Sequence, residues 1–327
     1  MARGKASIEE VSRLSGVSIA TVSRVVHQNG RFSKETEKRV LQVMKELNYT
    51  PDRIAQGMRL KSMPVIGMIV PDILDDRYGL ILRTAQKRLF EAGFSSFVFN
   101  SNEDYAQAQS FIDSMAGQHA SGLIYVPDST AAFMDLHGLP TVFLERRPSF
   151  TVDVPHVQFL MNDRDCARNA MASLLKSGRR NVVLLGDRMG ISSCRERITG
   201  AVEALNAAGL EPVLLIPLNP HRSSEAISAF GDLLDRDIPV DSVFCVSVRL
   251  TVGVMSVLKT RGISREQIDV MGIGEHRLCK YGLIDYHSVN EPLEEMALEA
   301  ADTIIAMANG EEVPVPEKVF DCDVMCH

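Results

Sequence analysis

The sequence predicts a small all-α helix-turn-helix head, a short hinge helix and a two-lobed α/β body. Three observations support this fold class. Apolar residues in the first 50 positions recur at helical spacing, whereas from Pro64 onward strand-like apolar runs alternate with helical segments. The charge is also divided: residues 1–62 carry twelve Lys or Arg and six Asp or Glu, a balance of +6, so the remainder of this chain of net charge -7 carries -13. A basic head on an acidic body is typical of a protein that binds a polyanion.

The first helix of the head is expected from Ser7 to about Ser15. Ser7-Ile8-Glu9-Glu10 has the spacing of a capping box, in which the hydroxyl and the second carboxylate satisfy backbone amides of the first turn. Gly16 is expected to end this helix. Its apolar stripe consists of Ile8, Val11 and Leu14.

A second helix is expected directly after the turn Gly16-Val17-Ser18, with Ser18 as its N-cap. Two short helices joined by a three-residue turn that contains glycine form a helix-turn-helix. The buried side of the second helix is expected to consist of Val17, Val22, Val25 and Val26, and its other face of Ile19, Ala20, Thr21, Ser23 and Arg24. Such a face offers apolar contact for a thymine methyl, hydroxyls for phosphates and a bidentate donor for guanine. We therefore predict that this helix reads the major groove of DNA.

A third helix, capped by Ser33, is expected to close the core of the head. Its apolar residues are Val40, Leu41, Met44 and Leu47. The alternative interpretation is a bundle of three helices that pack together and do not bind DNA. The basic excess and the groove-compatible face of the second helix favour DNA binding over that alternative.

The segment after the head is a candidate hinge. Pro51 interrupts the third helix, and residues 52–60 are compatible with a helix too short to be stable alone. Such a segment could fold on DNA, with Met58 as an apolar wedge in the minor groove. A plain linker remains the alternative.

The body is expected to contain two α/β lobes of parallel sheet, with ligands bound in the cleft between them. The first lobe is assigned to about 64–159 plus 288–327, and the second to about 160–287. Expected strands are 65–70, 96–99, 122–126, 141–144, 182–185, 213–216, 242–246 and 270–273. Expected helices include 80–92, 163–177, 194–208, 223–235 and 251–261.

The six cysteines are scattered without a Cys-x-x-Cys pair, so they are expected to be reduced thiols rather than a disulfide framework. Cys322, Cys326 and His327 cluster near the end of the sequence, but they lack a second ligand pair, and we predict neither a metal nor a cofactor. No apolar run approaches the length of a membrane span, and the N-terminal residues lack the apolar core of a signal peptide. A cytoplasmic protein with no membrane partner is expected.

The chain resembles the lactose/galactose repressor family over essentially its whole length. The head carries the family's run Arg13-Leu14-Ser15-Gly16-Val17-Ser18-Ile19-Ala20-Thr21-Val22-Ser23-Arg24-Val25, followed by Tyr49-x-Pro51 and Ala55 of the hinge helix. The body carries Ile66-Gly67-x-Ile69-Val70-Pro71-Asp72, Arg195-x-Arg197-x-x-Gly200, Asp269 to Gly272, and Val289-x-x-Pro292 with Glu295. The resemblance implies a body like that of periplasmic binding proteins and a transcription regulator, usually a repressor. It also implies a homodimer on a near-palindromic operator, with association into tetramers left open.

The resemblance also implies roles for individual positions. Ile19, Ala20 and Arg24 would read bases, and Thr21, Ser23 and His27 would hold phosphates. Met58, where the family usually has leucine, would wedge a central base step. The candidate DNA-binding residues are therefore Ser18, Ile19, Ala20, Thr21, Ser23, Arg24, His27, Ala55 and Met58.

The candidate effector pocket departs from the family pattern. Leu74-Asp75-Asp76-Arg77-Tyr78 replaces a Ser-Asn-Pro-aromatic-aromatic run, Ser247-Val248 replaces an Asn-Asp pair, and Gly274-Glu275 replaces an acidic pair. Arg197, which meets the ligand in the family, and an acid after the fourth strand, Glu145, are retained. These changes disfavour neutral sugars that depend on the lost carboxylates and favour a charged or otherwise atypical effector, so a sugar-like or an anionic metabolite is expected. The candidate effector-binding residues are Leu74, Asp75, Tyr78, Glu145, Arg197, Ser247 and Gly274.

Three other functions are weighed against an effector-controlled regulator. A dinucleotide-dependent enzyme is disfavoured because Gly272-x-Gly274 lacks the third glycine of the fingerprint, and no catalytic arrangement stands out. A solute-binding transport protein is disfavoured by the basic head and the missing signal peptide. A regulator with a degenerate pocket that acts without an effector remains compatible with the altered pocket positions.

Overall fold

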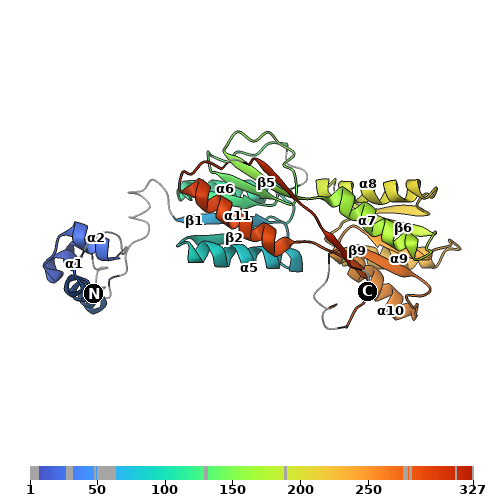
Figure 1. Ribbon diagram of the computed structural model, residues 1–327, viewed down its shortest axis with the longest axis horizontal. Coiled ribbons are helices and arrows are strands. Elements are labelled where there is room, and N and C mark those ends of the chain that lie inside the picture. The colour runs from blue at the N-terminus through green and yellow to red at the C-terminus, as the bar shows by residue number, and fades with distance from the viewer. Residues whose placement is uncertain are drawn as a thin grey trace. The chain divides into compact units, whose positions relative to one another are not determined.

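The computed structural model describes residues 7–26, 32–47, 49, 64–128, 132–187, 190–274, 279, 282–313 and 315–325. The chain divides into two compact units, Met1–Met63 and Pro64–His327 (Figure 1). The expected hinge segment 51–63, with Ala55 and Met58, lies outside the described residues, as do His27, Cys326 and His327.

The head contains α1 (Ile8–Ser15), α2 (Ile19–Val26) and α3 (Lys34–Glu46). Gly16 ends α1 with φ +67°, a left-handed conformation that glycine adopts without steric cost. The head's small core is formed by Val11, Val22, Val25 and Val40. Leu14, expected in the apolar stripe of α1, and Leu41, expected in the core, are about half exposed.

The first lobe is built on a parallel six-stranded sheet in the order β11-β5-β4-β3-β1-β2. Helices α5 and α11 pack on the sheet face that carries Ile66, Met68 and Val70, whereas Met115 of α6 packs against Gly67 on the opposite face. The elements are β1 (Val65–Val70), α5 (Asp76–Glu91), β2 (Ser95–Asn100), α6 (Tyr105–Gly117), β3 (Gly122–Tyr125), β4 (Thr141–Leu144), β5 (His156–Met161), α11 (Leu293–Ala308) and β11 (Glu317–Phe320). Helix α5 begins four residues earlier than predicted, because the side chain of Asp75 accepts a hydrogen bond from the Arg77 amide and caps it.

The second lobe contains a six-stranded sheet in the order β12-β10-β9-β8-β6-β7, in which only β12 is antiparallel to its neighbour. Helix α7 packs beside α8, and α9 packs beside α10. The elements are α7 (Asp163–Lys176), β6 (Val182–Asp187), α8 (Ser192–Ala207), β7 (Leu214–Leu218), α9 (Ser223–Leu234), β8 (Ser242–Cys245), α10 (Val248–Arg261), β9 (Asp269–Ile273), β10 (His287–Asn290) and β12 (Asp323–Met325).

The chain passes between the two lobes three times within the described residues. The crossovers lie between β5 and α7, between β10 and α11, and between β11 and β12. The last of these is the dark red ribbon that runs from the first lobe to the second in Figure 1. The predicted assignment of 288–327 to the first lobe is therefore wrong for 288–290 and 323–325, because β10 and β12 pair within the second sheet.

The expectation that all the cysteines are reduced is also wrong, because Cys166 and Cys322 form a disulfide with Cα atoms 5.7 Å apart. Cys166 lies in the first turn of α7, and Cys322 lies between β11 and β12. The two residues are 156 positions apart in sequence, so no local spacing pattern could indicate the pairing. Within the described residues, no helix is long and apolar enough to cross a membrane.

Candidate functional site

The predicted DNA-reading residues that the structure describes lie on the outer side of α2. Ser18 caps the helix, since its Oγ accepts a hydrogen bond from the Thr21 amide at 3.2 Å. Ile19, Ala20 and Arg24 are exposed, and Thr21 and Ser23 are half-buried. The opposite face of α2, with Val22 and Val25, is buried in the core of the head. The apolar spacing of α2 therefore directs its short, hydroxyl and guanidinium side chains outward.

The predicted effector residues lie together between the two lobes of the body. Leu74, Asp75 and Gly274 line a cavity of about 410 Å³, which is within the size range of small-molecule sites. Asp75 also lines a neighbouring cavity of about 30 Å³, room for roughly one water molecule. The other predicted effector residues line this small cavity: Tyr78, Glu145, Arg197 and Ser247. A third cavity, of about 450 Å³, has Glu145 in its wall as well.

Arg77, which we did not predict as a site residue, occupies the centre of this region. Its Nε donates to Glu145, and its Nη2 donates to Glu291 Oε1 at 2.7 Å. Glu145 follows β4 and adopts φ +63°, a left-handed conformation that is uncommon for a residue with a side chain. The backbone turn directly after β4 thus places a carboxylate against a guanidinium from α5.

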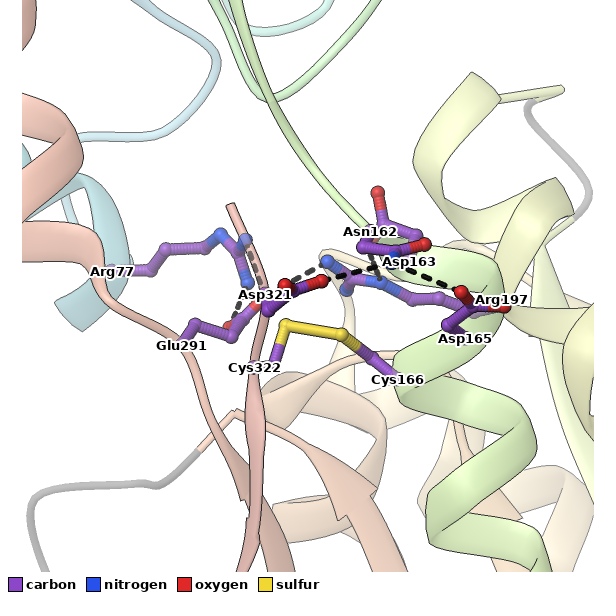
Figure 2. The surroundings of a disulfide bond; sticks show 9 residues. All are labelled: Arg77, Asn162, Asp163, Asp165, Cys166, Arg197, Glu291, Asp321 and Cys322. Atoms are coloured by element: carbon purple, nitrogen blue, oxygen red, sulfur yellow. Dashed lines mark hydrogen bonds and ion pairs between the residues drawn. A yellow bond between two sulfur atoms is a disulfide. The ribbon is translucent and has the colours of Figure 1, made fainter. Parts of the chain in front are cut away.

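Arg197 is buried and is already surrounded by acceptors. Its Nε donates to Asp163 Oδ1 at 2.7 Å, its Nη1 to the Val246 carbonyl at 2.8 Å and its Nη2 to Glu291 Oε1 at 3.0 Å. Figure 2 shows Glu291 between Arg77 and Arg197. The guanidinium that the sequence offered as a ligand contact is therefore neutralised by the protein's own carboxylates.

Burial and charge act in opposite directions on these carboxylates. Burial by itself would raise the pKa of Glu291, but the charges of Arg77 and Arg197 outweigh it and hold the pKa below its usual range. For Asp163 burial dominates and raises the pKa to about 6, although Arg197 opposes the shift. Glu291 is thus the more firmly ionised partner of Arg197.

A second buried cluster joins the lobes on the other side of Tyr78. Arg146 donates from Nη1 to Glu103 Oε1 at 2.7 Å and from Nη2 to the Tyr78 hydroxyl at 3.0 Å. His221, from the second lobe, approaches Glu103 to 2.9 Å. Burial opposes the ionisation of Glu103, yet His221 and Arg146 lower its pKa to about 2.

Further ion pairs between the lobes involve Asp75, which lines the cavity of about 410 Å³, and Asp72. Arg249 of α10 lies 3.3 Å from Asp72 and 3.6 Å from Asp75 of the first lobe. Ser247 caps α10 and donates from Oγ to the Pro220 carbonyl at 2.6 Å. Gly274 adopts φ +86°, and a Cβ there would lie 2.7 Å from a Val248 methyl, which explains glycine at the end of β9.

Sequence reasoning missed most of these charged partners. They are Arg77, Glu103, Arg146, Asp163, His221, Arg249 and Glu291. Arg77 lies inside the run Leu74 to Tyr78 that replaces the family pattern, and Glu291 lies inside the run Val289-x-x-Pro292 that resembles it, so both were close to positions that the sequence had singled out. The other partners are far apart in sequence and carried no local signal.

Comparison with known proteins identifies the family. Residues 7–52 match the family described as "Bacterial regulatory proteins, lacI family", and residues 63–280 match "Periplasmic binding proteins and sugar binding domain of LacI family". The chain belongs to the LacI family. It is a DNA-binding transcription regulator with a helix-turn-helix head and a sugar-binding type of body.

Full-length relatives agree with this LacI-family assignment. The chain is 27% identical to "HTH-type transcriptional regulator CelR" of Thermobifida fusca, over 99% of this chain and 98% of the relative. It is 25% identical to "HTH-type transcriptional regulator GalR" of Escherichia coli, over 96% of this chain and 93% of the relative. These named relatives are regulators rather than enzymes.

Solved structures share the fold of this LacI-family chain. A Lac repressor dimer bound to operator and the anti-inducer ONPF superposes with a TM-score of 0.85 at 20% identity, over 99% of this chain and 98% of the other. A CelR–cellobiose complex superposes with a TM-score of 0.70 at 25% identity, over 98% and 99%. The predicted fold class, a helix-turn-helix head on a two-lobed α/β body, is confirmed.

Proposed function

We propose that this LacI-family regulator is a repressor that binds a near-palindromic operator as a homodimer, and that a small molecule in the interlobe cleft changes its operator affinity. The outward face of α2, with Ile19, Ala20 and Arg24 exposed, is the observation that carries the proposal. Two such faces in one dimer would enter successive major grooves about 34 Å apart, which requires a palindrome. Thr21, Ser23 and His27 are proposed to hold phosphates, and Ala55 and Met58 to enter the minor groove.

Exposed apolar side chains support the homodimer. Phe90 of α5 is 80% exposed, and Phe97 and Val98 are exposed on β2, an edge strand of the first sheet. Leu215 is exposed on β7, the corresponding edge strand of the second sheet. Apolar surface along both sheet edges is typical of a face covered by another subunit. Analytical ultracentrifugation distinguishes a dimer from a monomer and from the tetramer that the family resemblance left open.

The operator proposal is tested by selecting duplexes from random DNA on the purified full-length protein. The expected result is enrichment of a two-fold symmetric sequence, with two half-sites about one helical turn apart. Enrichment of an unsymmetric sequence would contradict the dimeric reading mode. No enrichment at all would contradict sequence-specific binding by this head.

The charges of the cleft favour a sugar-like effector over an anionic one. Arg77 and Arg197 are each paired with carboxylates, so an anion would have to displace Glu145, Asp163 or Glu291. Carboxylates such as Asp75 and Asp76 line the cavity of about 410 Å³ and can accept hydrogen bonds from hydroxyl groups. We therefore assign the sugar-like class first, with Leu74, Asp75 and Gly274 as its contacts. Tyr78, Glu145, Arg197 and Ser247 would join the contacts when the ion pairs open.

A thermal-shift screen separates the two effector classes. Neutral mono- and disaccharides are expected to raise the unfolding temperature, whereas sugar phosphates and dicarboxylates are expected to leave it unchanged. Stabilisation by the anions alone would restore the expectation of an anionic effector that the pocket sequence suggested.

A second candidate function is regulation without an effector. The small cavity at Tyr78 and Arg197 has a volume of only about 30 Å³, because paired side chains fill the region. A cleft held closed by its own ion pairs could keep the lobes in one arrangement. Operator affinity that no metabolite changes would favour this candidate.

The proposal includes neither catalysis nor solute transport, and it assigns no cofactor. A DNA-binding regulator acts where the DNA is, so we place it in the bacterial cytoplasm. Turnover of a nicotinamide cofactor by the purified protein would contradict the non-enzymatic assignment.

A further inference from the structure

Cys166 and Cys322 connect two of the three crossovers between the lobes. Cys166 lies one turn after the first crossover, and Cys322 lies within the third. The same two crossovers are already hydrogen-bonded, since Asn162 donates from Nδ2 to Asp321 Oδ1 at 2.9 Å and its amide donates to the Phe320 carbonyl at 2.8 Å. Figure 2 shows the sulfur bridge beside this contact and beside the Arg77–Glu291–Arg197 cluster.

This position makes the bond a constraint on movement between lobes. Relative rotation of two lobes requires changes of backbone torsion in the segments that connect them. A covalent bond between the first and third crossovers couples their torsions, which reduces the rotations that remain possible. The Cα separation of 5.7 Å is in the usual range for a disulfide, so thiol and disulfide forms can exchange with little backbone movement.

The two cysteines differ in access to solvent. Cys166 is buried, whereas Cys322 is half-buried and is flanked by Asp321 and Asp323. Asp165 lies next to Cys166. These carboxylates repel anionic oxidants such as glutathione disulfide, whereas a small neutral peroxide meets no such repulsion. A partly exposed thiol with a second thiol in reach has two features of reversible redox sites.

We propose that Cys166 and Cys322 are a peroxide-reactive pair whose oxidation restricts interlobe movement and thereby changes operator affinity. The Cys322 thiolate attacks one oxygen of hydrogen peroxide, the O–O bond breaks, and the released hydroxide takes up a proton as water. The Cys166 thiolate then attacks the sulfenic sulfur, the S–O bond breaks, and the released hydroxide takes up the proton that the Cys166 thiol gave up, which makes the second water. Two thiols and one peroxide give one disulfide and two waters, and a dithiol reductant reverses the reaction.

The test uses the reduced full-length protein before and after hydrogen peroxide, and again after dithiothreitol. Peptide mass mapping without reductant is expected to show Cys166 linked to Cys322. Affinity for the duplex selected on the reduced protein is expected to change within the roughly 5- to 150-fold range typical of allosteric coupling, and dithiothreitol should reverse the change. Cys322→Ser and Cys166→Ser should abolish the change, whereas Cys279→Ser, at another half-buried cysteine, should keep it.

Two results would overturn the proposal. One is the absence of the linked peptide after oxidation, and the other is a linked peptide with unchanged operator affinity. Cys322→Ser leaves the buried Cys166 in place, so the result does not depend on whether Cys166→Ser folds. The operator measurement rests on the proposed function. Reduced protein that selects no duplex would contradict that function and not the cysteine pair. The mass mapping tests the cysteine pair independently of DNA binding.

Discussion

Arg77 and Glu291 form a bidentate ion pair that joins the start of α5 to the crossover between β10 and α11. Nη1 donates to Oε2 at 2.5 Å, and Nη2 donates to Oε1 at 2.7 Å. The same carboxylate accepts a hydrogen bond from Arg197 of the second lobe at 3.0 Å. One buried carboxylate thus holds a cation from each lobe, and the interlobe contact depends on its charge.

Replacement of Glu291 by Gln should destabilise the body strongly. The neutral amide leaves two buried guanidinium groups without their shared counter-charge, and breaking such an arrangement costs about 3–5 kcal/mol. Urea unfolding of the full-length protein measures the effect. Glu294→Gln is the matched control, since Glu294 is exposed and pairs with the exposed Arg83, and its loss should cost about 1 kcal/mol or less. Equal effects of the two substitutions would contradict the assigned role of Glu291.

Replacement of Arg24 by Ala should relax operator specificity. Loss of a bidentate contact to guanine is expected to cost about 1–3 kcal/mol on the selected duplex and to permit other bases at one position of each half-site. Competition binding against random duplex measures the ratio of specific to nonspecific affinity. Arg13→Ala removes the same charge from an exposed position on α1 and should leave that ratio unchanged. An unchanged ratio for Arg24→Ala would exclude a base-reading role.

The buried Glu103 should make the body sensitive to acid. Its pKa in the folded protein is about 2 instead of 4.5, so the stability it contributes is present above pH 4.5 and is lost as the pH falls toward 2. The shift corresponds to roughly 3 kcal/mol. Urea unfolding at a series of pH values should show a smaller loss of unfolding free energy in this window for Glu103→Gln than for the unchanged protein.

Asp163, whose pKa is raised from 3.8 to about 6, should have the opposite effect. The stability that it contributes is fully present below pH 3.8 and is lost as the pH rises through 6. Asp163→Asn should remove that loss, and a pH profile unaffected by either substitution would be inconsistent with both assignments.

Replacement of two glycines of the body by alanine should change the free energy of unfolding in opposite directions. A Cβ on Gly200 of α8 would lie 2.0 Å from the Arg164 carbonyl oxygen of α7, so Gly200→Ala must force these helices apart and lower the free energy of unfolding. Gly117, the last residue of α6, has nothing within 4 Å of such a Cβ. Gly117→Ala should therefore stabilise by about 0.4–1 kcal/mol, because it restricts the unfolded chain. Paired urea titrations measure both changes, and a tolerated Gly200→Ala would contradict the close contact of α7 and α8.

Local patterns predicted most helices and most strands of both units. Ser7 and Gly16 delimit α1 as expected, because capping and left-handed glycine are decided within a few residues. The strands and helices that flank the second and third crossovers were harder to predict. The patterns assigned no elements to β10, α11, β11 and β12, so the lobe boundary at 288–327 was misplaced.

The sequence by itself determined a basic helix-turn-helix head and an α/β body, because both follow from spacings shorter than one helix or strand. Only the tertiary structure decided which charges and thiols meet. Arg197 reaches Asp163 across 34 residues, Cys166 reaches Cys322 across 156, and Arg77 reaches Glu291 across 214. The crossovers bring these partners together, and the pairing turned an arginine that looked available for a ligand into part of the contact between lobes.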